Sequence, residues 1–352
     1  MQFFFIFLPL ITISCGTDAE SEEWNGVWQN LGLEAHEINA IDYSDAYLFV
    51  IGKEQIFRND LSMVAKEWIS LSLEINSQNS EFGDILVASE EVYAVSKNTT
   101  DYHELPENYT SLYKSIDDGE SWEPIQISLE GRERPYVINR LSRNENSFYA
   151  DWHFIFKSTD GKTWKNLSEG EKVGVSEFLY ISKDYPNQVW TGGWTNSFSA
   201  YLAKSSDGGE TWTELNENVS FNTDANANST AIHQENERMV LVGFGGGVSL
   251  ANVVRKSADG GETWNTVLEG YNIQALKNSS VQSGRVYGSG ISPKGRLFVA
   301  ISTDYGDNWR IEEFKESPGE VQTNEMIVTE VEGRETIFFA TNKGVYSFTL
   351  ED

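Results

Sequence analysis

Apolar segments of about four to seven residues alternate along the chain with short stretches rich in Gly, Asn, Asp and Ser. The pattern is clearest where "VSEFLYI" (Val175–Ile181) is followed by the turn "SKDYPN", "QVWTGG" (Gln188–Gly193), "AYLAKS" (Ala200–Ser205) and "WTEL" (Trp212–Leu215). Short apolar runs bounded by turn residues predict β-strands. The pattern therefore predicts repeated units of four strands, which we name A to D.

A polar motif, Ser-x-Asp-x-Gly-x-Thr-Trp, joins strand C to strand D in these units. Five good copies are present, and their aspartates are separated by 43, 47, 52 and 45 residues. The aspartates and the tryptophans that follow them are Asp117 and Trp122, Asp160 and Trp164, Asp207 and Trp212, Asp259 and Trp264, and Asp304 and Trp309. A decayed sixth copy is expected at Arg58–Trp68.

The residue types of the motif suit a tight turn. Aspartate accepts hydrogen bonds from turn N–H groups, glycine supplies the positive φ of the corner, and tryptophan starts the next strand and packs between sheets. The spacing of an EF-hand and its distal Glu are absent. We therefore expect a structural role for the motif and no metal site.

The motif resembles the Asp-box, or BNR, repeat over residues 115–309. The segments "KDYPNQVW" (Lys183–Trp190) and "ATNKGVY" (Ala340–Tyr346) resemble sortilin-like and photosystem II stability/assembly factor propellers more than sialidases. The resemblance implies an all-β fold, a β-propeller of four-stranded blades. A period near 47 residues favours seven blades, with six or eight as alternatives.

The two ends of the chain complement each other. The last unit ends after strand C, while "GVWQNLGL" near the N-terminus matches "TWTEL" and "TWKNL" and lacks a unit of its own. We expect Trp28–Leu31 to pair with Val345–Leu350 and so close the ring. The A strands are expected near Ile38, Ile85, Val137, Phe178, Ala231, Ile273 and Met326.

The N-terminus has the features of a secretory signal. Residues 1–14 contain no charged side chain, and their apolar run is shorter than the roughly 20 residues that span a bilayer. "TISCGTDAESEE" resembles a bacterial lipoprotein signal. This implies a signal peptide at 1–14, lipid attachment at Cys15, an acidic linker at 15–23, and a propeller at 24–352. The location implied is the outer membrane, surface-exposed; a periplasmic or secreted protein is the alternative.

Charge and composition narrow the partners. The net charge of −28 repels phosphate backbones, so we expect no nucleic acid partner, and membrane contact only through the lipid. With Cys15 assigned, no cysteine is left for a disulfide, and the four histidines lack metal-ligand spacing. We expect a monomer without cofactor or metal.

One face of the ring is the candidate binding face. The B–C and D–A loops lie on it, opposite the C–D turns, and in related propellers this face binds ligands. Its aromatic groups can bind a polysaccharide or a protein, although each can instead cover a strand end. The candidate residues are Tyr102, His103, Arg132, Arg134, Trp152, His153, Trp194, Phe198, Phe244, Lys294 and Arg296.

Two functions follow from these features. The first is a noncatalytic binding or assembly-scaffold propeller at the cell surface. The alternative is an exo-acting, sialidase-like glycoside hydrolase with its site at the channel mouth. A sialidase needs three arginines for the substrate carboxylate, and only Arg132, Arg134, Arg140 and Arg296 are placed for this, without an early Arg-Ile-Pro element. We therefore assign no catalytic residue.

Overall fold

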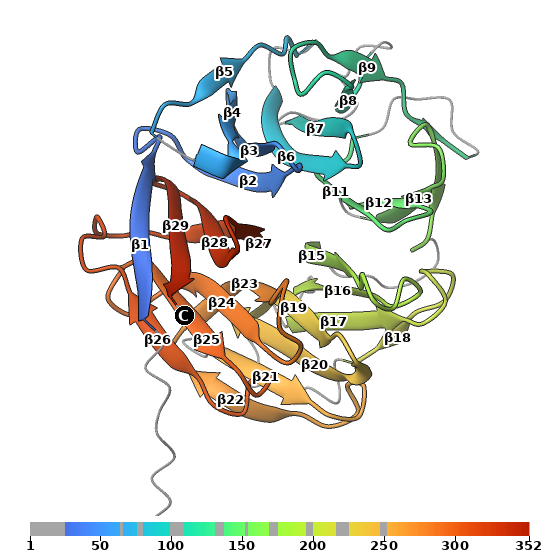
Figure 1. Cartoon of the computed structure of the whole chain (residues 1–352). Coiled ribbons are helices and arrows are strands. Elements are labelled where there is room, and N and C mark those ends of the chain that lie inside the picture. The colour runs from blue at the N-terminus through green and yellow to red at the C-terminus, as the bar shows by residue number, and fades with distance from the viewer. Residues whose placement is uncertain are drawn as a thin grey trace, which may run out of the picture.

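Seven antiparallel sheets are arranged around a central axis like the blades of a propeller (Figure 1). The structure is a computed structural model that describes residues 25–63, 66–75, 80–98, 109–130, 137–151, 154–168, 175–194, 200–215, 225–246 and 252–351. The predicted seven blades of four strands are confirmed. In the described part of the chain, the one helical element is the 3-10 turn Leu61–Met63, and no helix is long and apolar enough to cross a membrane.

The strands follow one another from the axis outward in each blade, A to D. Blades 1 to 3 consist of β2 (Ile38–Tyr43), β3 (Tyr47–Gly52), β4 (Ile56–Asp60) and β5 (Ile69–Leu71); β6 (Ser80–Ala88), β7 (Glu91–Asn98), β8 (Leu112–Ser115) and β9 (Glu123–Ile125); and β11 (Arg140–Arg143), β12 (Phe148–Asp151), β13 (Ile155–Ser158) and β14 (Thr163–Asn166). Blades 4 and 5 consist of β15 (Val175–Ile181), β16 (Val189–Trp194), β17 (Ala200–Ser205) and β18 (Thr213–Glu214); and β19 (Asn226–His233), β20 (Asn236–Gly245), β21 (Val253–Ser257) and β22 (Asn265–Glu269). Blades 6 and 7 consist of β23 (Asn272–Asn278), β24 (Val286–Ile291), β25 (Phe298–Ser302) and β26 (Arg310–Glu313); and β27 (Thr323–Val331), β28 (Arg334–Thr341), β29 (Gly344–Glu351) and β1 (Asn25–Gly32).

Blade 7 closes the ring with strands from both ends of the chain, as expected. β1 pairs antiparallel with β29, with Trp28 opposite Phe348 (Figure 1). The Trp28 ring lies 4.9 Å from Phe348 and 5.6 Å from Phe314 of blade 6, between centroids. Gly26 leaves room for Phe348, because a Cβ at Gly26 would lie 2.0 Å from that ring. Closure therefore joins sequence-distant segments through aromatic packing.

One extra strand was not predicted. The chain leaving blade 2 forms β10 (Ser128–Leu129), which adds in parallel to the outer edge of blade 3 beside β14. β10 has only two residues, too few to show a periodic pattern.

Five C–D turns contain the motif, and we call them box turns; in each, the aspartate accepts hydrogen bonds from the serine two residues before it and from N–H groups of the turn. In blade 4, Ser205 Oγ donates to Asp207 Oδ1 at 2.7 Å, and Asp207 accepts from the Thr211 N–H and hydroxyl at 2.9 and 2.6 Å. Hydrogen bonds led by that of Thr211 lower the pKa of Asp207 to about 2. The same bonds recur around Asp259, and also around Asp117 and Asp304, where Ser121 and Asn308 take the place of threonine. In the shorter turn of blade 3, Asp160 accepts from the N–H groups of Lys162 and Thr163.

Neighbouring blades meet at the box turns. Gly209 has a φ of 93° and packs on Leu167 of blade 3. Lys157 Nζ of blade 3 donates to Gly208 O at 3.1 Å, and Lys204 Nζ donates to Gly260 O of blade 5 in the same way. Arg58, at the start of the expected decayed copy, donates to Asp118 O in the turn of blade 2 at 2.6 Å. In blades 1, 3 and 4 a cation of strand C therefore ties the blade to the turn of the next blade.

Candidate functional site

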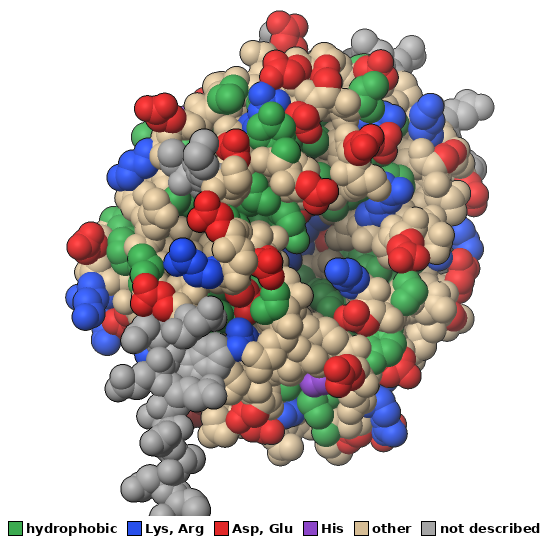
Figure 2. Space-filling view, viewed as in Figure 1, with side chains coloured by type: hydrophobic (Ala, Val, Ile, Leu, Met, Phe, Trp, Pro, Cys, Tyr) green, Lys and Arg blue, Asp and Glu red, His purple; other side chains and the backbone are tan. Residues whose placement is uncertain are grey.

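A cavity of about 380 Å³ lies on the axis of the ring, lined by the A strands of all seven blades. Figure 2 shows the molecule hollowed at its centre, with both acidic and basic side chains around the opening. Because an A strand has no neighbouring strand on its axial side, its backbone N–H and C=O groups there need other partners.

A β-bulge near the start of the A strand places a polar residue at the same level in most blades. The bulges in blades 1, 2, 4, 5, 6 and 7 leave one residue unpaired: Asn39, Gly83, Glu177, Asn228, Gln274 and Asn324. The A strands begin on the side of the D–A loops. The bulge residues therefore lie toward the B–C and D–A face, away from the box turns.

Three carboxyl groups connect adjacent A strands. Glu325 Oε2 accepts from Ile41 N at 3.1 Å. Asp42 Oδ2 accepts from Val87 N at 2.6 Å, and Asp84 Oδ2 accepts from Leu141 N at 2.7 Å. These bonds satisfy inner-edge N–H groups and link blades 7, 1, 2 and 3 in order.

Burial shifts these carboxyl groups toward their neutral form. Desolvation raises the pKa of Asp42 to about 7, against hydrogen bonds from Val87 and Tyr43 that lower it. Desolvation and then repulsion by Glu325 raise the pKa of Asp84, and desolvation raises that of Glu325. The carboxyl groups of Asp84 and Glu325, which lie on either side of blade 1, therefore interact electrostatically.

Two cations balance part of this charge. Arg140 Nη1 lies 3.5 Å from Asp151 Oδ2, and Arg140 Nη2 lies 3.9 Å from Glu177 Oε2. Lys277 Nζ lies 3.9 Å from Glu325 Oε1. Separations of 3.9 Å are too long for hydrogen bonds, so both ion pairs are open to a further polar group.

Four of the sequence-predicted residues fall within the described structure. Trp194, half-buried, ends β16 and donates its Nε1 to Glu177 Oε1 at 3.0 Å, which places it beside the cavity. Lys294 and Arg296 both pair with Glu313 on the outer strand of blade 6. Phe244 is a correction, because it is fully buried in a core cluster and presents no ring to a ligand. The other candidates lie outside the described residues: Tyr102, His103, Arg132, Arg134, Trp152, His153 and Phe198.

The arginines considered for a substrate carboxylate do not gather within the described structure. Arg140 lines the cavity among carboxyl groups, while Arg296 pairs with Glu313 and does not line the cavity. No group of three or more His, Cys, Asp or Glu side chains in the described ranges could hold a metal ion. The geometry favours binding of polar groups along the axis.

The sequence analysis missed Asp84, Glu177, Lys277 and Glu325, all of which line the cavity. The signal was present as a polar residue in an otherwise apolar A strand, two to five positions after its start. Aligning the seven A strands at their bulges would have placed Glu177, Asp84 and Glu325 within one residue of the same level, with Lys277 three residues beyond its bulge.

No known protein-family description matches the chain, and no curated protein matches it. Several solved structures resemble it over nearly its full length. A structure titled "YCF48 bound to D1 peptide" is 15% identical with a TM-score of 0.65, and 95% of this chain covers 98% of that one. The GH74 xyloglucanase from Xanthomonas campestris is 13% identical, TM-score 0.65, with 92% of this chain covering 53% of it. The extracellular domain of a putative one-component system from B. thetaiotaomicron is 10% identical, TM-score 0.63, with coverage of 94% and 40%. At these identities the likeness establishes the β-propeller fold.

Proposed function

We propose that this chain is a noncatalytic binding protein that holds a segment of a protein ligand over the channel mouth, on the B–C and D–A face. The observation that supports this most is the axial cavity with two open ion pairs, Arg140–Glu177 and Lys277–Glu325. A polypeptide offers N–H and C=O groups together, so it can hydrogen-bond to both members of each pair. Trp194 at the rim supplies a partly apolar surface for a side chain.

A binding role also fits the way the channel groups are used. Asp42 and Asp84 each accept two backbone N–H groups, so both have a structural function in the ring. The structural neighbour described as bound to a peptide has the same fold over nearly equal length. We place the binding face outside the cell, tethered through Cys15, with residues 15–23 as the linker.

The test is a screen of the purified protein on peptide and glycan arrays, followed by affinity measurements. Trp194→Ala should weaken the selected peptide at least about fivefold. Ile116→Ala is the matched control, because Ile116 is 71% exposed on the opposite face, in a box turn. Ligands that bind both variants equally would contradict the assignment of the face.

A second candidate, glycoside hydrolysis, is favoured by one observation. Asp84 and Glu325 share the cavity, and both have a raised pKa, as a carboxylic acid that donates a proton requires. Hydrolysis of a chromogenic glycoside that is abolished by Glu325→Gln, and by Asp84→Asn, would establish this activity and overturn the noncatalytic proposal. Hydrolysis unchanged by both substitutions would point to a contaminating enzyme.

A further inference from the structure

Blades 7, 1 and 2 present hydrogen-bond acceptors at one level of the channel. Asn324 and Asn39 lie at bulge positions, and each donates its Nδ2 to a backbone carbonyl of the next blade at 2.8 Å, Ile38 O and Phe82 O respectively. A carbonyl oxygen cannot donate, so these contacts fix the orientation of both amides. The Oδ1 atoms accept no hydrogen bond from any described residue, and both side chains line the cavity.

A carboxyl group follows the bulge residue directly in blades 7 and 2. Glu325 comes after Asn324. Among the described charged groups, only Lys277 Nζ lies within 4 Å of Glu325 Oε1, at a distance of 3.9 Å. Asp84 uses each oxygen for one backbone N–H, from Ile85 and Leu141, and each oxygen retains a second lone pair. We name Asn39, Asp84, Asn324 and Glu325 the acceptor wall.

The wall is continuous around blade 1. Glu325 bonds to the backbone of β2 on one side, and Asn39 of β2 bonds to the backbone of β6 on the other. Asp84 and Glu325 line the cavity on either side of blade 1, and the charge of Glu325 raises the pKa of Asp84. Amide oxygens and carboxyl groups of blades 7, 1 and 2 therefore line the same part of the ring around the cavity.

We propose that the acceptor wall binds the guanidinium group of an arginine side chain on the protein ligand, an inference that rests on the proposed function. A guanidinium has five N–H donors in one plane and keeps its charge, so it complements a wall of several oxygen acceptors, and its charge favours the ionised form of Asp84 and Glu325. The net charge of −28 attracts a basic segment toward the protein. An added cation also reduces the repulsion between Asp84 and Glu325.

Within the described structure, three cations of the protein itself line the same cavity, and one of them, Arg143, lies over the Phe148 ring at 4.7 Å from its centroid. Arg140 is held by Asp151, by Glu177 and by the Glu177 carbonyl on blades 3 and 4, and its charge lowers the pKa of both Asp84 and Glu325. Lys277 is nearer to Glu325, and its side chain is 40% exposed. Lys277 therefore repels a cation of the ligand. It does not take the place of the guanidinium, because 3.9 Å is too long for a hydrogen bond to Glu325.

The test is a calorimetric titration with the blocked peptide Ac-Gly-Ser-Arg-Ser-Gly-NH₂ and two relatives, in which citrulline or lysine replaces arginine. Citrulline keeps the shape and loses the charge. The arginine peptide should bind at least about tenfold more tightly than the citrulline peptide and severalfold more tightly than the lysine peptide. Equal binding of the arginine and citrulline peptides, or of the arginine and lysine peptides, would overturn the inference.

Variants distinguish binding at the acceptor wall from the general attraction of a basic peptide to an acidic protein. Glu325→Gln should weaken the arginine peptide about tenfold, whereas Glu330→Gln, which changes net charge equally at an exposed position, should not change it. Lys277→Gln should tighten binding severalfold, and it tests the wall if Glu325→Gln fails to fold. Equal losses in the two glutamate variants, or no gain in Lys277→Gln, would contradict the proposal.

The proposed binding face and the guanidinium site can be contradicted by different results. If a peptide from the array binds in a Trp194-dependent way but is indifferent to Glu325→Gln and to its own arginines, the guanidinium site is wrong and the binding face stands. If no ligand depends on Trp194, the binding face itself is wrong.

Discussion

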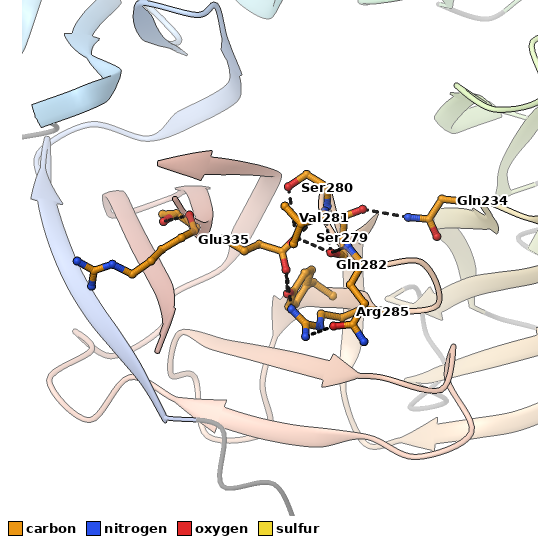
Figure 3. Close-up of polar contacts among 10 residues, drawn as sticks. Gln234, Ser279, Ser280, Val281, Gln282, Arg285 and Glu335 are labelled. Atoms are coloured by element: carbon orange, nitrogen blue, oxygen red, sulfur yellow. Dashed lines mark hydrogen bonds and ion pairs between the residues drawn. The ribbon is translucent and has the colours of Figure 1, made fainter. Parts of the chain in front are cut away.

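Replacement of Glu335 by glutamine should destabilise the protein strongly, because this buried carboxylate holds blades 6 and 7 together. Glu335 is 5% exposed near the start of β28. It accepts from Ser279 Oγ at 2.6 Å, Ser280 N at 2.8 Å, Arg285 Nη1 at 2.9 Å and Tyr287 Oη at 2.5 Å (Figure 3). All four donors come from blade 6 or its A–B loop.

The expected loss of stability follows from the contacts that glutamine cannot make in place of Glu335. Glutamine keeps the shape but places an NH₂ group against N–H or O–H donors, and it leaves Arg285, 6% exposed, without its counter-charge. Removing one partner of a buried ion pair costs about 3–5 kcal/mol. We expect a loss of this size in the free energy of unfolding, measured by urea denaturation at pH 7. Glu330→Gln, at an exposed position in the same blade, should change it by less than about 0.5 kcal/mol.

The effect should depend on pH with a defined sign. Burial alone would raise the pKa of Glu335, but hydrogen bonds from Ser279, Tyr287 and Arg285 outweigh it and lower the pKa. A lowered pKa means that the ionised carboxylate stabilises the fold above the unfolded pKa of roughly 4.3, and that this contribution is lost as pH falls through the folded value. The gap between wild type and Glu335→Gln should therefore narrow below about pH 4. A loss under about 1 kcal/mol at pH 7, or a gap that widens in acid, would refute the reasoning.

Three further predictions follow from the turns, the channel and the N-terminus. Gly261→Ala should lower the unfolding free energy, measured by urea denaturation, by about 1–3 kcal/mol, because Gly261 has a φ of 94° and a Cβ would lie 2.8 Å from Leu215. Gly333→Ala is the control for backbone strain alone, because Gly333 also has a positive φ but a Cβ there would have no atom within 4 Å. The pKa of Asp42 is raised to about 7, so the neutral carboxyl group favours the folded state and the unfolding free energy should fall as pH rises from about 4 to 7. This dependence of stability on pH should be weaker in Asp42→Asn, and an unchanged dependence would exclude Asp42 as its source. Cys15→Ala should release the protein from the membrane fraction of cells that express it, and recovery of the variant with the membranes would contradict lipid attachment.

Most of the fold could be predicted from the sequence because the repeat is regular and its residues act locally. The blade 4 pattern gave β15 at its observed bounds, and the match of "VWQNL" to the other D strands predicted the pairing of β1 with β29. The A strand of blade 3 was expected near Val137 and begins at Arg140, where the apolar pattern is weakest.

The site was harder to predict for a physical reason. Both faces of a blade pack against neighbouring blades, so a strand end near a loop can still be buried, as Phe244 is. In the A strands, Asp84 follows Gly83 and Glu325 follows Asn324, and neither gives a local sign that it reaches the neighbouring blade. Their partners are backbone groups of the next blade, and such contacts have no sequence pattern.

The central claim is that ligands bind at the B–C and D–A end of the channel. Hydrogen–deuterium exchange of the protein with its array-selected peptide tests this most directly. The account predicts slower exchange at the start of β2, β6 and β27 and at the end of β16, with the box turns around Asp207 and Asp259 unchanged. Slower exchange confined to the box turns, with the channel ends of the A strands unaffected, would contradict it.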